Sequence, residues 1–235
     1  ISTDTGFTVT STYTTTATSA YATLSQTTYY WRVCAKDNAG NYSLYSTPYS
    51  VIVDTTPPPT PTLSTPIHGY TTNQLTLTFE WTAVTDIGPA GLSHYKLEIS
   101  TRADFIPIYY STTTPDAEVS YDTKASATFY WRVCAIDRAS NYSLLPTPYS
   151  LIIDTIPPPA PLLISPIDNF ATNYLTLTFT WTGTDLGPAG VKNFIVEFST
   201  DSFLTIYHST ITTLTSYTTT FIENAYWWKV KTQDR

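Results

Sequence analysis

Six aspartates are the side chains of this chain best suited to binding a cation. Each belongs to one of two sets, in which one residue ends a closing strand before a linker, one lies in a Gly-Pro loop and one lies at the hairpin before the last strand. The sets are Asp54, Asp86 and Asp137, and Asp154, Asp185 and Asp234. Hard cations such as Ca²⁺ bind several carboxylate oxygens. The sequence therefore predicts calcium at two places, if each set converges; the alternative is that these aspartates cap turns and oppose pairing of strand edges.

Two cysteines, Cys34 and Cys134, occupy the same place in two copies of one sequence pattern. A copy with a single cysteine cannot form a disulfide within itself. Alternation along the strand places Cys134 on the outer face, where an extracellular thiol is open to oxidation. The pattern predicts disulfides between neighbouring molecules, and the alternative is a thiol covered by adjacent side chains of the sheet.

Two glycosylation sequons, Asn-Tyr-Ser, begin at Asn41 and Asn141. Both lie in a turn that the sequence predicts to be exposed, so sugars attached to Asn41 and Asn141 are one interpretation. The other is that Asn stands there because it tolerates the left-handed turn conformation.

Catalysis by these residues is not expected. The three histidines, His68, His94 and His208, recur at no shared position and belong to no motif of a nucleophile or a metal site. The sequence also has no Gly-rich phosphate loop, no paired-cysteine metal motif and no Gly-x-Ser-x-Gly elbow. We predict that the chain is not an enzyme.

Short β-strands are the elements that must position these side chains. Leu75 to Trp81 alternates strictly between apolar and polar residues, and Leu175 to Trp181 repeats the pattern. A period of two is that of a strand with one buried face. Gly 8, Pro 17 and abundant Thr and Ser are typical of strands joined by turns.

The chain repeats itself at the scale of a small β-domain. Trp31 and Trp131 are 100 residues apart, as are Pro57 and Pro157. The repeat predicts three domains: residues 1–56 as the back part of one repeat, 57–156 as a complete repeat and 157–235 as a repeat without its last strand. Proline runs begin the second and third repeats and predict short, stiff linkers.

Five tryptophans fall at inward-facing positions of the predicted strands. Burial of such a side chain contributes up to a few kcal/mol. The expected core tryptophans are Trp31, Trp81, Trp131, Trp181 and Trp228.

Three motifs together resemble one family. They are a Tyr-Trp-Arg-Val-x-Ala strand at Tyr30 to Ala35, an Asp-x-Ala-Gly-Asn turn at Asp37 to Asn41, and a Val-Asp-Thr-Thr-Pro-Pro linker at Val53 to Pro58. The pattern is similar to bacterial tandem fibronectin type III-like or immunoglobulin-like repeat proteins of the cell surface. The resemblance implies an all-β fold of tandem seven-stranded sandwiches joined by Pro-rich linkers.

Charge and hydropathy restrict the partners. The net charge of -7 leaves no basic stripe for phosphates, so we expect no nucleic-acid partner. No apolar run is long enough to span a bilayer, and we expect no membrane insertion in this segment. With Met 0, the sequence is expected to be an interior or processed piece of a longer chain.

The resemblance implies a structural role outside the cell. We expect an extracellular or cell-surface location, and a segment of a long surface protein, filament or sheath that acts as a spacer and as a self-assembly or adhesion module. Its partners would be copies of itself, neighbouring repeats or cell-surface glycans and proteins. The alternatives are the non-catalytic spacer of a secreted carbohydrate-active enzyme and a ligand-binding adhesin module. No cofactor is expected other than calcium.

Overall fold

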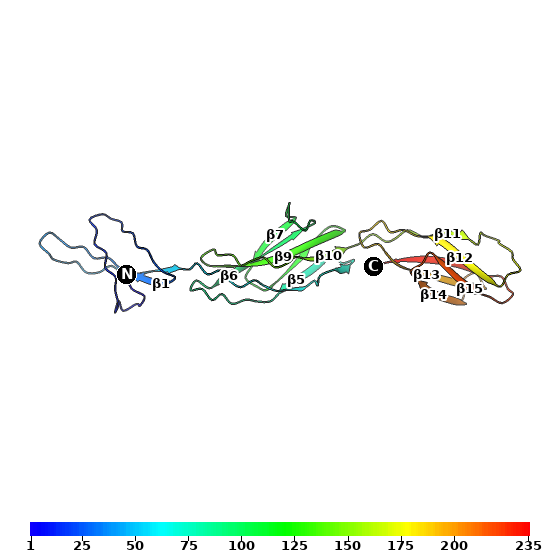
Figure 1. Ribbon diagram of the computed structural model, residues 1–235, viewed down its shortest axis with the longest axis horizontal. Helices are drawn as coiled ribbons and strands as arrows, with labels where there is room; N and C mark the ends of the chain where they lie inside the picture. The colour runs from blue at the N-terminus through cyan, green and yellow to red at the C-terminus, as the bar shows by residue number, and fades with distance from the viewer.

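The structure, a computed structural model, describes residues 1–235 as an all-β chain drawn out along one axis (Figure 1). None of its segments is a helix that is long and apolar enough to cross a membrane. Sixteen strands form five sheets. The strands are β1 (Thr27–Trp31), β2 (Tyr49–Val53), β3 (Leu63–Thr65), β4 (Tyr70–Thr72), β5 (Thr76–Trp81), β6 (Leu92–Ser100), β7 (Tyr110–Thr114), β8 (Glu118–Asp122), β9 (Ala127–Asp137), β10 (Tyr149–Ile153), β11 (Leu162–Ser165), β12 (Thr176–Thr182), β13 (Val191–Ser199), β14 (His208–Thr212), β15 (Ser216–Thr220) and β16 (Trp227–Asp234).

The middle repeat contains two sheets. One has the strand order β3-β5-β8 and the other has the order β4-β10-β9-β6-β7. All pairings are antiparallel except that of β4 with β10, which is parallel. This order, with the late strands β9 and β10 beside β6 and β7, is that of an immunoglobulin-like sandwich in its fibronectin type III arrangement. The expected fold class is confirmed.

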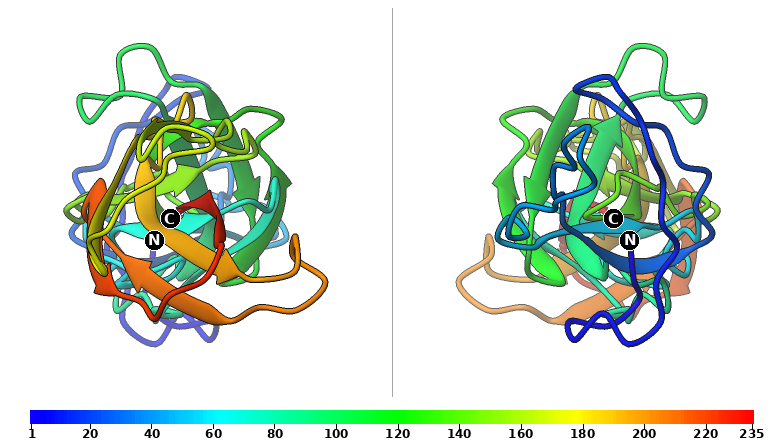
Figure 2. Two further views of the ribbon diagram at one scale, coloured as in Figure 1. Left: turned by 90° about the vertical axis from the view of Figure 1, so that its right-hand side faces the viewer. Right: turned by 90° about the vertical axis from the view of Figure 1, so that its left-hand side faces the viewer.

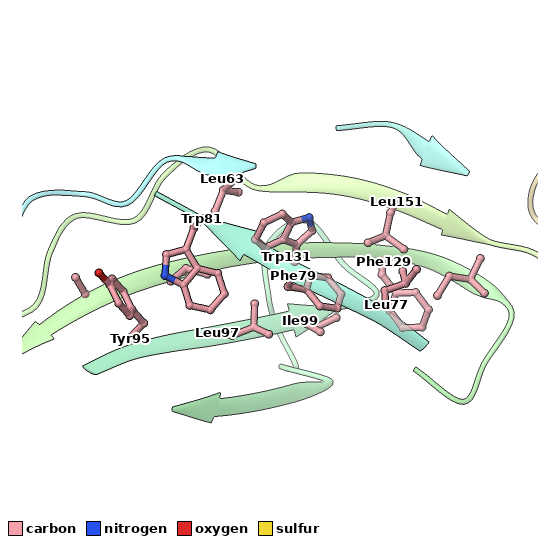
Figure 3. Close-up of a cluster of buried hydrophobic side chains, with 13 residues drawn as sticks. Leu63, Leu77, Phe79, Trp81, Tyr95, Leu97, Ile99, Phe129, Trp131 and Leu151 are labelled. Atoms are coloured by element: carbon pink, nitrogen blue, oxygen red, sulfur yellow. The ribbon is translucent and has the colours of Figure 1, made fainter. Parts of the chain in front are cut away.

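The core of the middle repeat lies between its two sheets (Figure 3). Along β5 the buried positions alternate with partly exposed ones, as the period-two pattern predicts, and Phe79 is fully buried. From the opposite sheet, Trp131 of β9 is also fully buried and meets the edge of the Phe79 ring at 5.2 Å between centroids. Thirteen buried residues belong to this cluster, so the middle repeat has a hydrophobic core of its own.

The third repeat copies this arrangement with sheets β11-β12-β15 and β14-β13-β16. Its core cluster has six buried residues, and Trp181 is 1 % exposed. Trp228 is only partly buried, but its ring packs against Phe179 at 5.0 Å between centroids. Both tryptophans therefore contribute to the core, as expected.

The first repeat consists of one strand pair, β1 and β2. The expectation that Trp31 is a core residue is wrong for the structure, since 39 % of this side chain is exposed. The physical reason is that no second sheet of residues 1–56 faces β1 and β2, so Trp31 packs only against the neighbouring Tyr49, at 5.7 Å between ring centroids.

The repeats follow one another along the long axis of the molecule (Figure 1). The two views along that axis in Figure 2 show the repeats overlapping, with both termini near the centre. The domain boundaries at residues 56 and 156 stay predictions.

Candidate functional site

At the first junction, between the first and middle repeats, three carboxylates meet. Asp54 follows β2, Asp86 lies in the loop between β5 and β6, and Asp137 is the last residue of β9. One carboxylate oxygen from each lies within 4.8 Å of those of the other two. The structure thus brings together the first set of aspartates that the sequence singled out.

Asp54 connects the linker to the next repeat. Its Oδ2 accepts a hydrogen bond of 2.8 Å from the backbone N–H of Ala90, and its Oδ1 accepts one of 2.9 Å from that of Thr56. The Asp54 carboxylate lies directly against Gly88, where a Cβ atom would overlap it. Glycine is required at this position because the carboxylate approaches the backbone so closely.

Asp137 is held by the turn that follows it. Its Oδ1 accepts hydrogen bonds of 2.8 Å from the backbone N–H groups of Ala139 and Asn141, and its Oδ2 accepts one of 2.7 Å from the Asn141 side-chain amide. The same amide donates to the backbone carbonyl of Asp54 at 3.1 Å. Asn141 therefore ties the turn to the linker, a role that the sequence did not reveal.

The role of Asn141 bears on the two sequons. Nδ2 of Asn141, the atom that a glycan would modify, already makes two hydrogen bonds in a partly buried site. Asn41 makes the same local contact with Asp37, at 2.9 Å, but is exposed. Glycosylation stays a prediction, and the geometry favours Asn41 over Asn141.

Negative charge at the first junction is not compensated by a salt bridge. The four salt bridges of the structure involve none of the three aspartates. Asp86 keeps some exposed surface as a residue, but its Oδ2 is buried and has no hydrogen-bond partner. Two unit charges at this spacing repel by about 3 kcal/mol at an effective dielectric constant of 20. The arrangement therefore favours a bound cation.

At the second junction, between the middle and third repeats, the linker contacts the next loop in the same way as at the first junction. Oδ2 of Asp154 accepts a hydrogen bond of 2.8 Å from the backbone N–H of Ala189, and its carboxylate lies against Gly187. Asp185 again has a buried Oδ2 without a partner. Asp234 ends β16 and lines a polar cleft of about 540 Å³ with Asp154, but this second set does not form a close group of three.

Cys134 differs from its expected environment. The thiol lies outside the core cluster, as alternation predicts, but its residue is only 6 % exposed because β6 runs alongside and places Lys96 opposite it. Burial, and then the negative charge of Glu98, raise the pKa of the Cys134 thiol. An exposed thiol at Cys134 is therefore a wrong expectation; a disulfide between molecules stays a prediction, and the partly exposed Cys34 suits it better.

A cation–π contact that the sequence did not reveal occurs once in each repeat. A cationic side chain in a late strand, or directly after one in the case of Arg32, lies over a phenylalanine ring whose backbone φ is positive, which is rare for this residue. The pairs are Arg32 over Phe7 at 4.1 Å, Arg132 over Phe105 at 3.9 Å and Lys229 over Phe203 at 4.3 Å. The signal was available, since these residues recur with the period of the repeat.

The histidines lie at separate places. Nδ1 of His68 accepts a hydrogen bond of 3.1 Å from the backbone N–H of Ser150, whereas the other two contact Ser93 and Tyr217. The absence of catalysis stays a prediction.

Comparison with known proteins finds similar solved structures but no matching family or curated sequence. No protein-family model and no curated sequence matches the chain. Solved structures that are similar include the fibronectin(III)-like modules of Clostridium thermocellum CbhA, with 16 % identity over 74 % of this chain and 85 % of that one, at a TM-score of 0.39. The FN1–FN3 domains of chicken CNTN1 match with 12 % identity, over 87 % of this chain and 69 % of that one, at a TM-score of 0.35.

Three consecutive domains of titin match with 13 % identity, over 88 % of this chain and 69 % of that one, at a TM-score of 0.45. Likenesses at these values do not bear on function. The strand order and register of the middle repeat define the class of protein: a tandem array of fibronectin III-like, immunoglobulin-like sandwiches.

Proposed function

We propose that this chain is a segment of an extracellular spacer, in which successive sandwiches are held end to end at a set angle. The repeated junction carries this proposal. At each linker an aspartate, Asp54 or Asp154, accepts a hydrogen bond from the loop of the next repeat and fills the space that Gly88 or Gly187 leaves. A side chain held in this way limits bending at a proline linker, so the array keeps its length.

We further propose that the chain makes lateral contact with a second copy of itself. Large apolar side chains are exposed at corresponding positions of two repeats: Leu44 is 94 % exposed and Leu144 is 81 % exposed. Because repeats recur along one axis, such positions present the same contact again at each repeat. A filament or sheath built from parallel copies uses this kind of surface.

Small-angle X-ray scattering of the whole chain tests the spacer function. We expect one narrow distribution of lengths for the natural chain in chelating buffer, and a wider distribution for Asp154→Ala, which loses the hydrogen bond from Ala189. Asp168→Ala is the control, since Asp168 is exposed and bonds only with the adjacent Asn169.

A natural chain that is already as flexible as Asp154→Ala would contradict the spacer function. The same data report mass from the forward scattering. A mass that rises with concentration supports lateral contact between copies, and a constant monomer mass counts against it.

A further inference from the structure

The buried carboxylates of the first junction have no positively charged partner, although charge of this kind is costly to bury. Asp54 is 8 % exposed and Asp137 is 2 % exposed. Arg138 is next to Asp137 in the sequence, but its guanidinium reaches toward the backbone carbonyl of Ala90, at 3.5 Å, and makes no salt bridge. No cationic side chain of the structure forms a salt bridge with these carboxylates.

The second observation is the orientation of Asp86. Its Oδ1 accepts a hydrogen bond of 3.1 Å from the backbone N–H of Gly88, which fixes the carboxylate. Its other oxygen, Oδ2, is buried, has no hydrogen-bond partner and belongs to a carboxylate of the three-membered group. A buried acceptor without a donor is costly, so a cation bound next to this oxygen would lower its free energy.

We propose that Asp54, Asp86 and Asp137 bind one calcium ion at the first junction. Calcium–oxygen bonds of about 2.3–2.6 Å place two ligand atoms on the same ion up to about 5 Å apart. The spacing of the three carboxylate oxygens, within 4.8 Å of one another, satisfies this limit without any rearrangement of the backbone. The ion provides the charge that Arg138 does not provide.

Hydrogen bonds from the surrounding backbone hold the ligands in place. Asp54 is fixed by Ala90, Asp86 by Gly88, and Asp137 by Ala139 and Asn141. Partners that orient the ligands in this way raise the affinity of a site because less freedom is lost on binding. The carboxylates are in position before the ion binds.

Ligand chemistry favours calcium over other metals. The group offers only carboxylate oxygens, whereas zinc and copper prefer nitrogen and sulfur. Magnesium demands near-octahedral geometry at shorter distances and gives up water reluctantly. Calcium accepts six to eight oxygens in a flexible arrangement, and water can supply those that the three side chains do not.

The ion would connect separate parts of the chain. Asp54 belongs to the end of the first repeat, and Asp86 and Asp137 belong to two different loops of the middle repeat. Binding therefore depends on the relative position of the two repeats, and it stabilises only the arrangement in which they meet. This inference concerns ion binding alone and holds whether or not copies of the chain assemble.

Calorimetric titration of the whole chain with CaCl₂, after removal of metal by a chelator, tests the inference. We expect one equivalent of calcium with a Kd of about 10⁻⁴ to 10⁻³ M, the range of extracellular modules. In 10 mM CaCl₂ we expect the melting temperature to rise by about 5 °C or more above its value in EDTA. No binding heat together with an unchanged melting temperature would overturn the proposal, as would an equal rise in 10 mM MgCl₂.

Two variants locate the site. Asp86→Asn keeps an oxygen for the N–H of Gly88 and places an NH₂ group where the unpartnered oxygen lies. We expect this variant to melt in EDTA at or above the temperature of the natural chain, and to lose the rise in CaCl₂. Asp185→Asn is the matched control, because Asp185 has the same buried, unpartnered oxygen but no close group of three.

The control is expected to keep the full response to calcium. A response that survives in Asp86→Asn, or one that is lost in Asp185→Asn, overturns the assignment. Asp86→Ser replaces Asp86→Asn if the amide variant does not fold.

Discussion

The two junctions of this chain share the contact between the linker aspartate and the next loop, and they differ in the contacts of the late strand and its turn. At both, an aspartate after a strand accepts the N–H of an alanine in the next loop and lies against a glycine. At the first junction Asp137, the last residue of β9, adds a third carboxylate, and Asn141 of the following turn bonds to Asp137 and to Asp54. At the second junction Asp154, Asp185 and Asp234 do not form a close group of three.

The difference shows which contact the two junctions have in common. At both junctions the linker aspartate accepts the N–H of an alanine in the loop after the second strand of the next repeat. A close group of three carboxylates forms at the first junction, where the turn after β9 holds Asp137. Alignment and the proposed ion site therefore share Asp54 and the loop of Asp86, and Asp137 is the ligand that comes from a separate turn.

The largest expected effect comes from the glycines that both junctions share. A methyl group in Gly88→Ala or Gly187→Ala would overlap the carboxylate of Asp54 or Asp154. We expect each change to destabilise its junction by about 3 kcal/mol, as overpacking does at a rigid site. Thermal melts in EDTA measure this.

The neighbouring changes Ile87→Ala and Leu186→Ala are controls, because these side chains are 81 % and 77 % exposed. We expect them to alter stability by less than about 0.5 kcal/mol. A large effect of Gly88→Ala beside a negligible effect of Gly187→Ala would show that the two junctions are not built alike.

A smaller effect is expected from Asn141 at the first junction. Asn141→Ala removes the hydrogen bonds to Asp137 and to the Asp54 carbonyl and leaves a buried carboxylate oxygen without this donor. We expect a loss of about 1.5 kcal/mol in chemical denaturation with EDTA present. Asn41→Ala, the control, removes the equivalent contact at an exposed turn and should cost much less. Equal losses at both positions would argue against a bridge across the junction.

The smallest expected effect is the loss of stability in acid, which can be compared between the middle and third repeats. Hydrogen bonds from the Ser199 hydroxyl, and then from Thr205, lower the pKa of Asp201 to about 2 from its usual 3.8. In the middle repeat, Arg102 first and then the N–H of Ile106 hold the pKa of Asp104 at about 2. A carboxyl group whose pKa is lower in the folded state stabilises that state above its unfolded pKa, and the contribution is lost as pH falls toward the folded pKa.

Calorimetric melts between pH 5 and pH 2 measure this contribution. We expect the natural chain to melt slightly above Asp201→Asn and Asp104→Asn at pH 5, and most of each difference to be lost by about pH 2. A difference as large at pH 2 as at pH 5 would mean that the hydrogen bonds, and not the charge, stabilise these loops.

Much of the fold could be predicted from the sequence, because period-two alternation and the internal repeat both reflect the geometry of strands. The convergence of Asp54, Asp86 and Asp137 was also predictable, since loops at one end of a sandwich lie together in this topology. Trp31 was not, because the pattern of a strand does not show whether a second sheet covers it. Cys134 is buried by Lys96, a residue from another strand whose register no local pattern reveals.

The Asn141 bridge was missed for a similar reason. The Asn-Tyr-Ser pattern describes a local turn, whereas the bond from Asn141 to the Asp54 carbonyl joins residues 87 positions apart in the chain. Contacts between an amide and a distant backbone carbonyl leave no periodic signal in one sequence.

The parallel pairing of β4 with β10 has a consequence for a chain under tension. Pulling the ends of the middle repeat apart draws on β4 from its first residue and on β10 from its last. The two strands then slide in opposite directions along their length, so their hydrogen bonds are strained in shear and must break together instead of opening one by one. Resistance of this kind depends on the rate of forced unfolding rather than on equilibrium stability. A short strand of three residues, Tyr70–Thr72, is thus placed so that tension on the middle repeat would load its bonds to β10 in shear.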